Sequence, residues 1–323
     1  MPQGAETGQE RKAAGRQRGF VLLVVLSALG LLAIVAASFA QIARSHVKAV
    51  LAAGESARAE ALADAGVQLV ILDLVGAREA QPSSRRFALD AAPLFCSIGS
   101  DGSSLAIAVQ DEAGKVDLNL GSEPLLRALV LGLGIGAADA KVDAILDFRD
   151  EDDDRRADGA ERAEYRAAGR SYGPRNGPFL AIEELAGVLG VAQADADRLR
   201  PFVTIYSGLP AIDANVAPQA LIDIVARGSD QAGGSRPFSG IATGMGMGRK
   251  GPAAPLSAQF LAASTRRAFS VHSEARTPAG ARFVREAVVE FVASTPGAYV
   301  VRRWHRGSSM LGPSPAAESL PPC

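Results

Sequence analysis

The stretch RQRGFVLLVVLSALGLLAIV, residues 16–35, decides how this chain begins to fold. A short basic segment leads into an apolar run that carries no charge from Phe20 to Ile42. Because a helix rises about 1.5 Å per residue, this run spans roughly the 30 Å hydrocarbon core of a bilayer. A secretory signal has only about 7–15 apolar residues, although AASFAQIA (36–43) resembles a cleavage site and keeps that alternative open. We therefore predict a transmembrane helix over 20–43.

The helical pattern continues beyond the apolar run. Ala, Leu and Val recur at helical spacing through residue 75, with polar residues on one side, and no proline occurs in the helix before Pro82. The sequence therefore predicts one helix from Phe20 to Val75, whose first half suits lipid and whose second half suits a protein core.

Charge before the apolar run predicts the orientation of this helix. Four basic residues precede Phe20, against two acidic ones. Positive charge holds the adjacent end of a membrane helix in the cytoplasm. We expect a single-pass protein of the inner membrane, with a cytoplasmic N-terminus and a periplasmic C-terminal domain.

A basic leader that ends in Gly, followed by Phe and a long apolar helix, resembles the type IV prepilins. The resemblance implies that residues 1–19 are a leader, that prepilin peptidase cuts after Gly19, and that Phe20 is then N-methylated. An ordinary single-pass anchor remains the alternative. Most members of the class carry Glu at the fifth mature position, which is Val24 here. In pilins that acid is thought to neutralise the terminal amine of a neighbouring subunit, so its absence suggests a subunit at the filament tip.

The remaining sequence reads as strands, then helices, then strands. Short strands are expected within 86–99 and 104–114, short helices from 118 to 225, and an antiparallel meander within 266–306. This order predicts an α+β fold with a helical domain inserted into a small sheet domain. The expected boundaries are 44–110 and 257–306 for the α+β domain, 111–227 for the helical domain, 228–256 for a flexible Gly- and Pro-rich loop and 307–323 for a disordered tail.

Five motifs in the middle of the chain carry a more specific resemblance. They are DEAGKVDLNL (111–120), AILDFRDEDDDRRADGAERAEY (144–165), YGPRNGPFLAIEELAGVLGV (172–191), LRPFVTIYSG (199–208) and IDANVAPQALI (212–222). Together they resemble the minor pseudopilin K family of type II secretion. The resemblance implies a type IV pilin-like fold, with a long N-terminal helix packed on a small antiparallel sheet and an inserted all-α domain. It also implies a non-enzymatic role in the pseudopilus tip, beside I- and J-type minor pseudopilins, in initiating pseudopilus assembly for protein export across the outer membrane.

An acidic run stands out between residues 139 and 164, where eleven acidic residues meet five basic ones. Hard carboxylate oxygens at this density favour Ca²⁺. With Asp150 as position 1, the spacing of Asp152, Asp154 and Glu161 follows an EF-hand loop, but Arg155 stands where that loop requires Gly. The pseudopilin K resemblance also implies calcium in the helical domain. Asp150, Asp152, Asp154 and Glu161 are therefore the candidate Ca²⁺ ligands, with a solvated charge run as the alternative.

Other functions find less support in the sequence. The segment 176–206 predicts a helix–turn–helix or helix-hairpin-helix element, a SAM-like feature that also occurs in DNA-binding proteins, so a membrane-anchored DNA-uptake protein is the alternative function. Its acidic surroundings and the net charge of −1 speak against nucleic acid. The sequence shows no recognisable pairing of a nucleophile with a base, so it gives no indication of a hydrolase. Cys96 and Cys323 could form a bridge in the periplasm, but the Pro- and Ser-rich tail around Cys323 makes that bridge the less favoured expectation.

Overall fold

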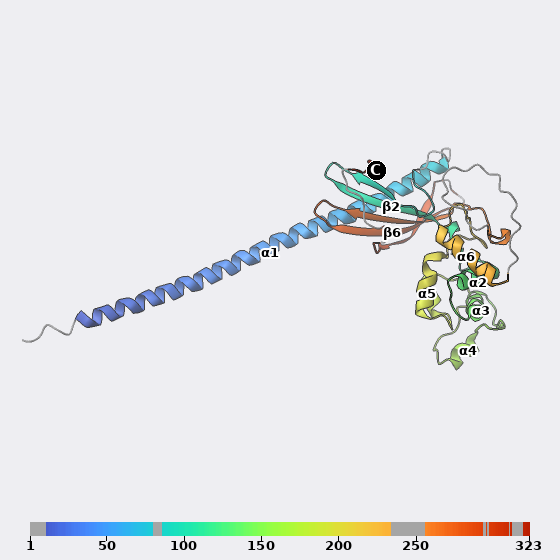
Figure 1. Cartoon of the computed structure of the whole chain (residues 1–323), viewed down its shortest axis with the longest axis horizontal. Helices are drawn as coiled ribbons and strands as arrows, with labels where there is room; N and C mark the ends of the chain where they lie inside the picture. Colours follow the sequence, from blue (N-terminus) through green and yellow to red (C-terminus); the bar gives the residue numbers. More distant parts are fainter. Residues whose placement is uncertain are drawn as a thin grey trace, which may run out of the picture. The chain divides into compact units, whose positions relative to one another are not determined.

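The computed structural model describes residues 11–79, 86–233, 256–292, 295, 297–309, 311 and 319–323. These residues form two compact units, Met1–Arg58 and Ala59–Cys323. The helix α1, Arg11–Glu79, crosses the boundary between them (Figure 1). It begins earlier and ends later than predicted, because good helix formers such as Ala and Arg occupy both flanks. The Gly19–Phe20 junction therefore lies inside a helix.

In the first unit, α1 is uncovered over most of its described length. Every side chain from Phe20 to Gly54 is exposed, and the helix is long and apolar enough to cross a membrane. Phe20 is 71% exposed and Phe39 is 76% exposed. Exposed apolar area on this scale marks contact with a membrane or a protein partner.

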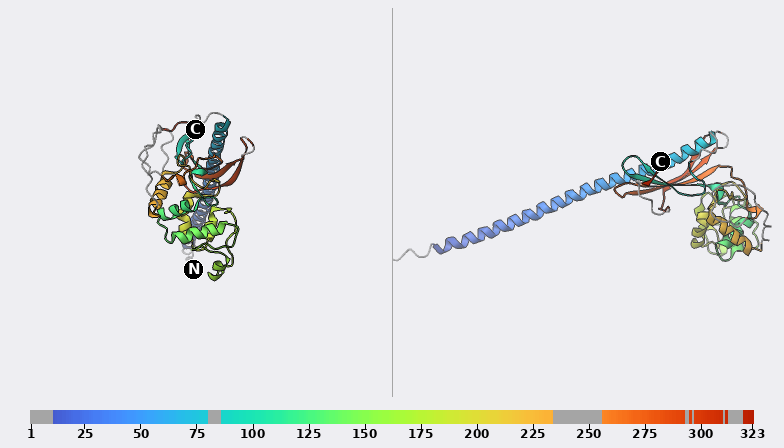
Figure 2. Two further views of the ribbon diagram at one scale, coloured as in Figure 1. Left: turned by 90° about the vertical axis from the view of Figure 1, so that its right-hand side faces the viewer. Right: turned by 45° about the horizontal axis from the view of Figure 1, so that its top comes forward.

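The second unit contains a five-stranded antiparallel sheet of order β1-β2-β5-β6-β7. Its strands are β1 Leu94–Ile98, β2 Ser103–Asp111, β5 Ala268–Arg276, β6 Arg282–Phe291 and β7 Tyr299–Arg306. The C-terminal part of α1 lies along this sheet, as the views in Figure 2 show. Val67, Ile71 and Leu74 of α1 are buried with Ile107, Phe269 and other residues of the strands. A long helix on an antiparallel sheet is the α+β arrangement predicted from the sequence.

Charges reinforce the packing of α1 on the sheet. Arg285 of β6 donates from Nε to Asp64 Oδ1 at 2.6 Å and from Nη2 to Glu60 Oε1 at 2.7 Å. Its guanidinium also lies over the rings of Phe283 and Trp304, at 4.9 and 5.2 Å from their centroids. Arg285 therefore ties two turns of α1 to the middle of the sheet.

The segment between β2 and β5 is mainly helical and has a hydrophobic core of its own. Its elements are η2 Glu112–Gly114, β3 Val116–Asp117, α2 Glu123–Gly132, α3 Ala138–Arg149, α4 Arg162–Ala167, η3 Ile182–Gly187, α5 Gln193–Leu199, η4 Arg200–Phe202, β4 Val203–Thr204, α6 Gln219–Gln231 and η5 Ala258–Phe260. Gly132 of α2 and Gly228 of α6 let these helices touch, since a Cβ on either would collide with the backbone of the other. Helix α6 continues beyond the predicted end of the helical region at residue 227, and most of the predicted loop, 234–255, lies outside the described residues.

Buried carboxylates join the sheet to this helical segment. Asp111, at the end of β2, accepts hydrogen bonds from the Ala113 amide and the Ser264 hydroxyl, at 2.9 and 2.6 Å. Glu112 accepts from Lys115 Nζ at 2.8 Å and from the hydroxyls of Thr204 and Ser270. Polar groups buried in this way specify one arrangement, because each loses its partners if the segment shifts.

The end of the chain differs from expectation. Cys96 of β1 and Cys323 form a disulfide, and residues around Pro322 pair with Ser97. The sequence argument disfavoured this bridge and expected a disordered tail from 307 to 323. It weighed only the composition of the tail, whereas the fold of residues 94–98 brings Cys96 within reach of Cys323.

Candidate functional site

The acidic run forms the connection between two helices. Helix α3 ends at Arg149 and α4 begins at Arg162, so the twelve residues from Asp150 to Glu161 form the loop. The ends of the loop are the better covered part: Asp150 is half-buried and Glu161 is 4% exposed, while residues 151–158 are exposed. An EF-hand loop also joins two helices, but Arg155 stands here where that loop requires Gly.

Several oxygens in this loop lack partners. Oδ1 of Asp150 and both carboxylate oxygens of Glu161 are buried; among the described residues Asp150 Oδ1 has no hydrogen-bond partner, and the Glu161 carboxylate has only the capping contact with the backbone N–H of Glu164. A buried carboxylate without a partner carries a large desolvation cost, and a bound cation removes that cost. These orphaned atoms are the feature of the loop that best fits a hard cation.

Electrostatics point the same way. Burial, together with the charges of Asp147, Asp150, Asp153 and Asp152, raises the pKa of Glu161 to about 7. Burial and the charge of Asp152 also raise the pKa of Asp150. These raised pKa values mean that burial and the neighbouring acids disfavour the ionised carboxylates, even though Arg149 and Arg156 act in the opposite direction on Asp150.

Two further residues belong to this neighbourhood: Asn176, which the sequence did not indicate, and Asp147, which belongs to the acidic run but is not among the four predicted ligands. Asn176 donates from Nδ2 to the Asp152 carbonyl and to Asp153 Oδ1, both at 2.9 Å, while its own Oδ1 is buried without a partner. Asp147 of α3 is completely buried, and burial raises its pKa. No spacing rule relates Asn176 to the loop, since it comes from the connection after α4; the Asn–Gly pair at 176–177 signals only a turn.

The four predicted ligands are not equivalent. Asp150, Asp152 and Glu161 interact electrostatically, whereas Asp154 is exposed and its amide donates to Asp152 Oδ1 at 2.9 Å. Within the described parts of the chain, no three His, Cys, Asp or Glu side chains are grouped as a ready metal site. Any cation here would therefore also use oxygens of other kinds, such as Asn176 Oδ1 or backbone carbonyls.

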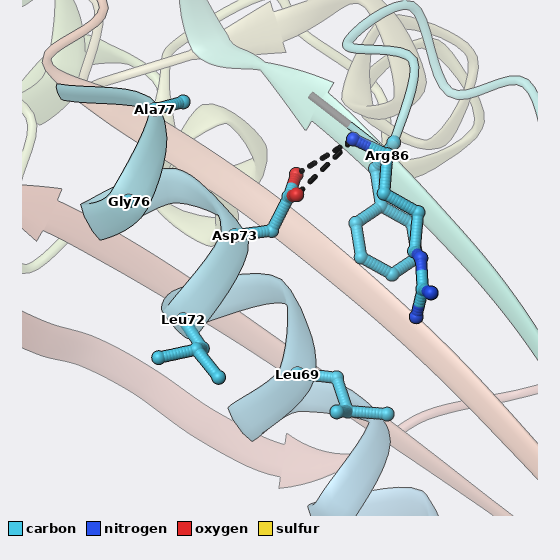
Figure 3. Close-up of a pocket in the computed structure, with 7 residues that line it drawn as sticks. Leu69, Leu72, Asp73, Gly76, Ala77 and Arg86 are labelled. Carbon is cyan, nitrogen blue, oxygen red and sulfur yellow. Dashed lines mark hydrogen bonds between the residues drawn. The ribbon is translucent and has the colours of Figure 1, made fainter. Parts of the chain in front are cut away.

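Apart from the acidic loop, a hollow lies against the C-terminal part of α1. Leu69, Leu72, Asp73, Gly76 and Ala77 line it together with Arg86 and Phe87. Figure 3 shows Asp73 facing Arg86, whose backbone N–H donates to both carboxylate oxygens at 3.1 and 3.3 Å. Its one acidic side chain is thereby occupied in fixing the chain after α1, and the hollow offers no catalytic grouping.

Comparison with solved structures agrees with this architecture. The chain resembles a chain in the crystal structure of the GspK-GspI-GspJ complex from the enterotoxigenic Escherichia coli type 2 secretion system. The TM-score is 0.50 at 19% identity, covering 83% of this chain and 99% of that one. The shared architecture is a pilin-like α+β fold, with a long N-terminal helix on an antiparallel sheet.

The family is defined by the middle of the sequence. Residues 105–211 match the family model described as type II secretion system (T2SS), protein K. This segment contains the first four of the five motifs, and it matches the family that those motifs resemble. No curated protein matches its sequence.

Proposed function

We propose that this protein is a minor pseudopilin of the type II secretion system that forms part of the pseudopilus tip complex and initiates pseudopilus assembly. The match of residues 105–211 to protein K carries this proposal. The role is structural, and we assign the protein no catalytic step.

The exposed half of α1 supplies the membrane anchor. Residues 20–43 cross the inner membrane, with the basic N-terminal segment in the cytoplasm and the unit that contains the sheet in the periplasm. The small residues Ala28, Gly30, Ala33, Ala36, Ala37 and Ser38 allow close approach of partner helices in the bilayer. The apolar surface that this chain leaves uncovered is then covered by lipid and by other pseudopilins.

Partners follow from the family and the fold. The similar solved chain belongs to a complex with GspI and GspJ, and we propose the corresponding I- and J-type minor pseudopilins as partners here. Val24 supports a position at the tip, because a subunit without the acid has nothing to neutralise the amine of a subunit ahead of it. The helical segment, proposed as an inserted domain over 111–227 with SAM-like elements, adds bulk that favours the tip over the shaft.

The cleavage site is tested by changing Gly19. Gly19→Val places a branched side chain at the junction, so prepilin peptidase should leave the leader on, and a strain that depends on this copy should lose secretion. Gly15→Val makes the same change within the leader and should behave as the wild type. Processing and secretion preserved in Gly19→Val would contradict peptidase recognition at this junction.

We also propose that the loop from Asp150 to Glu161 binds Ca²⁺. Asp150, Asp152 and Glu161 supply the charge, Asn176 Oδ1 supplies a neutral oxygen, and Asp154 is the weakest of the predicted ligands because it is exposed. Calcium would neutralise the mutual repulsion of these acids and so stabilise the α3–α4 connection.

Thermal melting of the full chain in detergent tests the calcium site. At a hundredfold excess of Ca²⁺ over Kd, binding should stabilise the folded state by about 2.7 kcal/mol relative to a chelator. Glu161→Gln should remove most of this gain, whereas Glu151→Gln, at an exposed position of the same loop, should keep it. Equal melting temperatures with calcium and with chelator would contradict calcium binding by this loop.

A further inference from the structure

The two edges of the five-stranded sheet are built differently. An edge strand presents unpaired backbone groups and invites pairing with another chain unless charges, bulges or a cover protect it. Edge strand β7 carries four basic residues in the stretch RRWHR, and its pairing with β6 is interrupted by an irregularity at Val288/Val289. Both features discourage the addition of a further strand.

Edge strand β1 has neither protection. Its sequence, LFCSI, contains no charged residue and no proline, and it pairs with β2 in unbroken register from Leu94 to Ile98. Short apolar segments of this kind are prone to pair with copies of themselves when exposed. An uncovered β1 would therefore be a site of self-association.

The end of the chain covers this edge. The Ser97 amide donates to the Pro321 carbonyl at 2.8 Å, and the Cys323 amide donates to the Ser97 carbonyl at 2.9 Å. Ser97 and Pro322 form a parallel bridge, so residues 319–323 continue the sheet beyond β1. Both outward-facing backbone groups of Ser97 are thereby satisfied.

A disulfide and hydrogen bonds hold this segment in place. Cys323 is bonded to Cys96, which is 1% exposed in the core under the sheet. Arg86 Nη1 donates to the Cys323 carbonyl, and Asp73 of α1 holds the Arg86 backbone (Figure 3). A terminal segment normally frays unless it is tied down in this way.

We propose that residues 319–323 form a disulfide-anchored strap whose role is to occupy the edge of β1 and prevent it from pairing with a second copy of this chain. The strap acts by competition, because the Ser97 backbone groups bond either to the strap or to another strand. With the strap in place the outward-facing backbone groups of Ser97 are not available to a second strand, so a partner must approach the protein through other surfaces. This inference is independent of the proposed secretion role.

Hydrogen exchange on the full chain in detergent tests the strap, comparing wild type with Cys323→Ser. Loss of the anchor should speed exchange in the peptide that contains Ser97 at least tenfold and leave β6 unchanged. The variant should also form dimers, detected by light scattering after gel filtration. Adding Ser97→Lys to Cys323→Ser should restore the monomer, because a charge on the edge opposes strand addition.

Three results would overturn the strap. The first is equal exchange at Ser97 in wild type and Cys323→Ser; the second is a variant that exposes Ser97 yet stays monomeric. If Cys323→Ser also speeds exchange in β6, wild type treated with dithiothreitol supplies a second comparison. In that sample we again expect faster exchange at Ser97 and unchanged exchange in β6. Faster exchange throughout the sheet in both samples would show that the disulfide supports the whole fold, and would equally overturn the proposal.

Discussion

Both halves of α1 are rich in apolar residues, but only one half buries them. From Phe20 to Gly54 every side chain is exposed, whereas Ala59, Ala63, Val67 and Val70 are completely buried. The sheet-bound half also has ionic partners, since Glu60 and Asp64 pair with Arg285. The comparison teaches that one half of the helix is stabilised by its own chain, while the other half depends on a membrane and on other proteins.

Matched side-chain truncations in the two halves of α1 should give the largest difference in the free energy of unfolding. Ile71 is 4% exposed and Ile34 is 66% exposed. Ile71→Ala should lower the free energy of unfolding by about 2–5 kcal/mol, because it leaves a cavity between α1 and the sheet. Ile34→Ala should change it by less than about 0.5 kcal/mol. Denaturant unfolding of the full chain in detergent measures both, and equal losses would break the comparison.

The ion pairs of the sheet-bound half should contribute less to the free energy of unfolding than the buried Ile71 side chain. Asp64→Ala should cost about 0.5–1 kcal/mol, since the Asp64 side chain is 36% exposed and water screens its pairing with Arg285. A double-mutant cycle with Arg285→Met isolates the pair, and we expect a coupling of the same size. Zero coupling would mean that apolar packing alone holds α1 on the sheet.

The smallest effect on stability is expected on substitution of Glu286, which lies on the same strand as Arg285. His272 Nδ1 and His305 Nε2 lie 3.3 and 3.1 Å from its carboxylate oxygens. The hydrogen bond from His272 and the charges of both histidines lower the pKa of Glu286 below its ordinary value of 4.5. Its ionised form therefore stabilises the fold above pH 4.5, and this contribution is lost as pH falls through the lowered value.

Glu286→Gln should accordingly reduce stability by about 0.5 kcal/mol at pH 6, a small figure because the side chain is 30% exposed. The difference from wild type should vanish in acid, where Glu286 is protonated in both the folded and the unfolded states. Melting curves from pH 3 to 7 measure it. A difference that grows toward low pH would contradict the assigned direction.

Local periodicity predicted the main elements of the fold. Phe20 to Val75 follows a helical pattern without a proline, and 266–306 alternates between two turns, so both could be recognised without tertiary information. The register that places β5 beside β2 could not, because it depends on buried partners such as Glu112 and Ser270 that lie far apart in the sequence.

The candidate site was predictable only where its residues are close in sequence. Asp150 and Glu161 follow from loop spacing, but Asn176 reaches the loop from another connection, and the exposure of Asp154 depends on how the loop folds. The prediction for the disulfide was wrong for a related reason. Composition described the tail around Cys323, but only the packed edge of β1 brings that tail to Cys96.

Locating this protein in isolated pseudopili tests the central claim most directly, namely that the uncovered half of α1 starts a filament beside other minor pseudopilins. An epitope at residue 230, labelled with gold and viewed by electron microscopy, should appear at one end of each filament and nowhere along its length. Label repeating along the shaft would contradict the account.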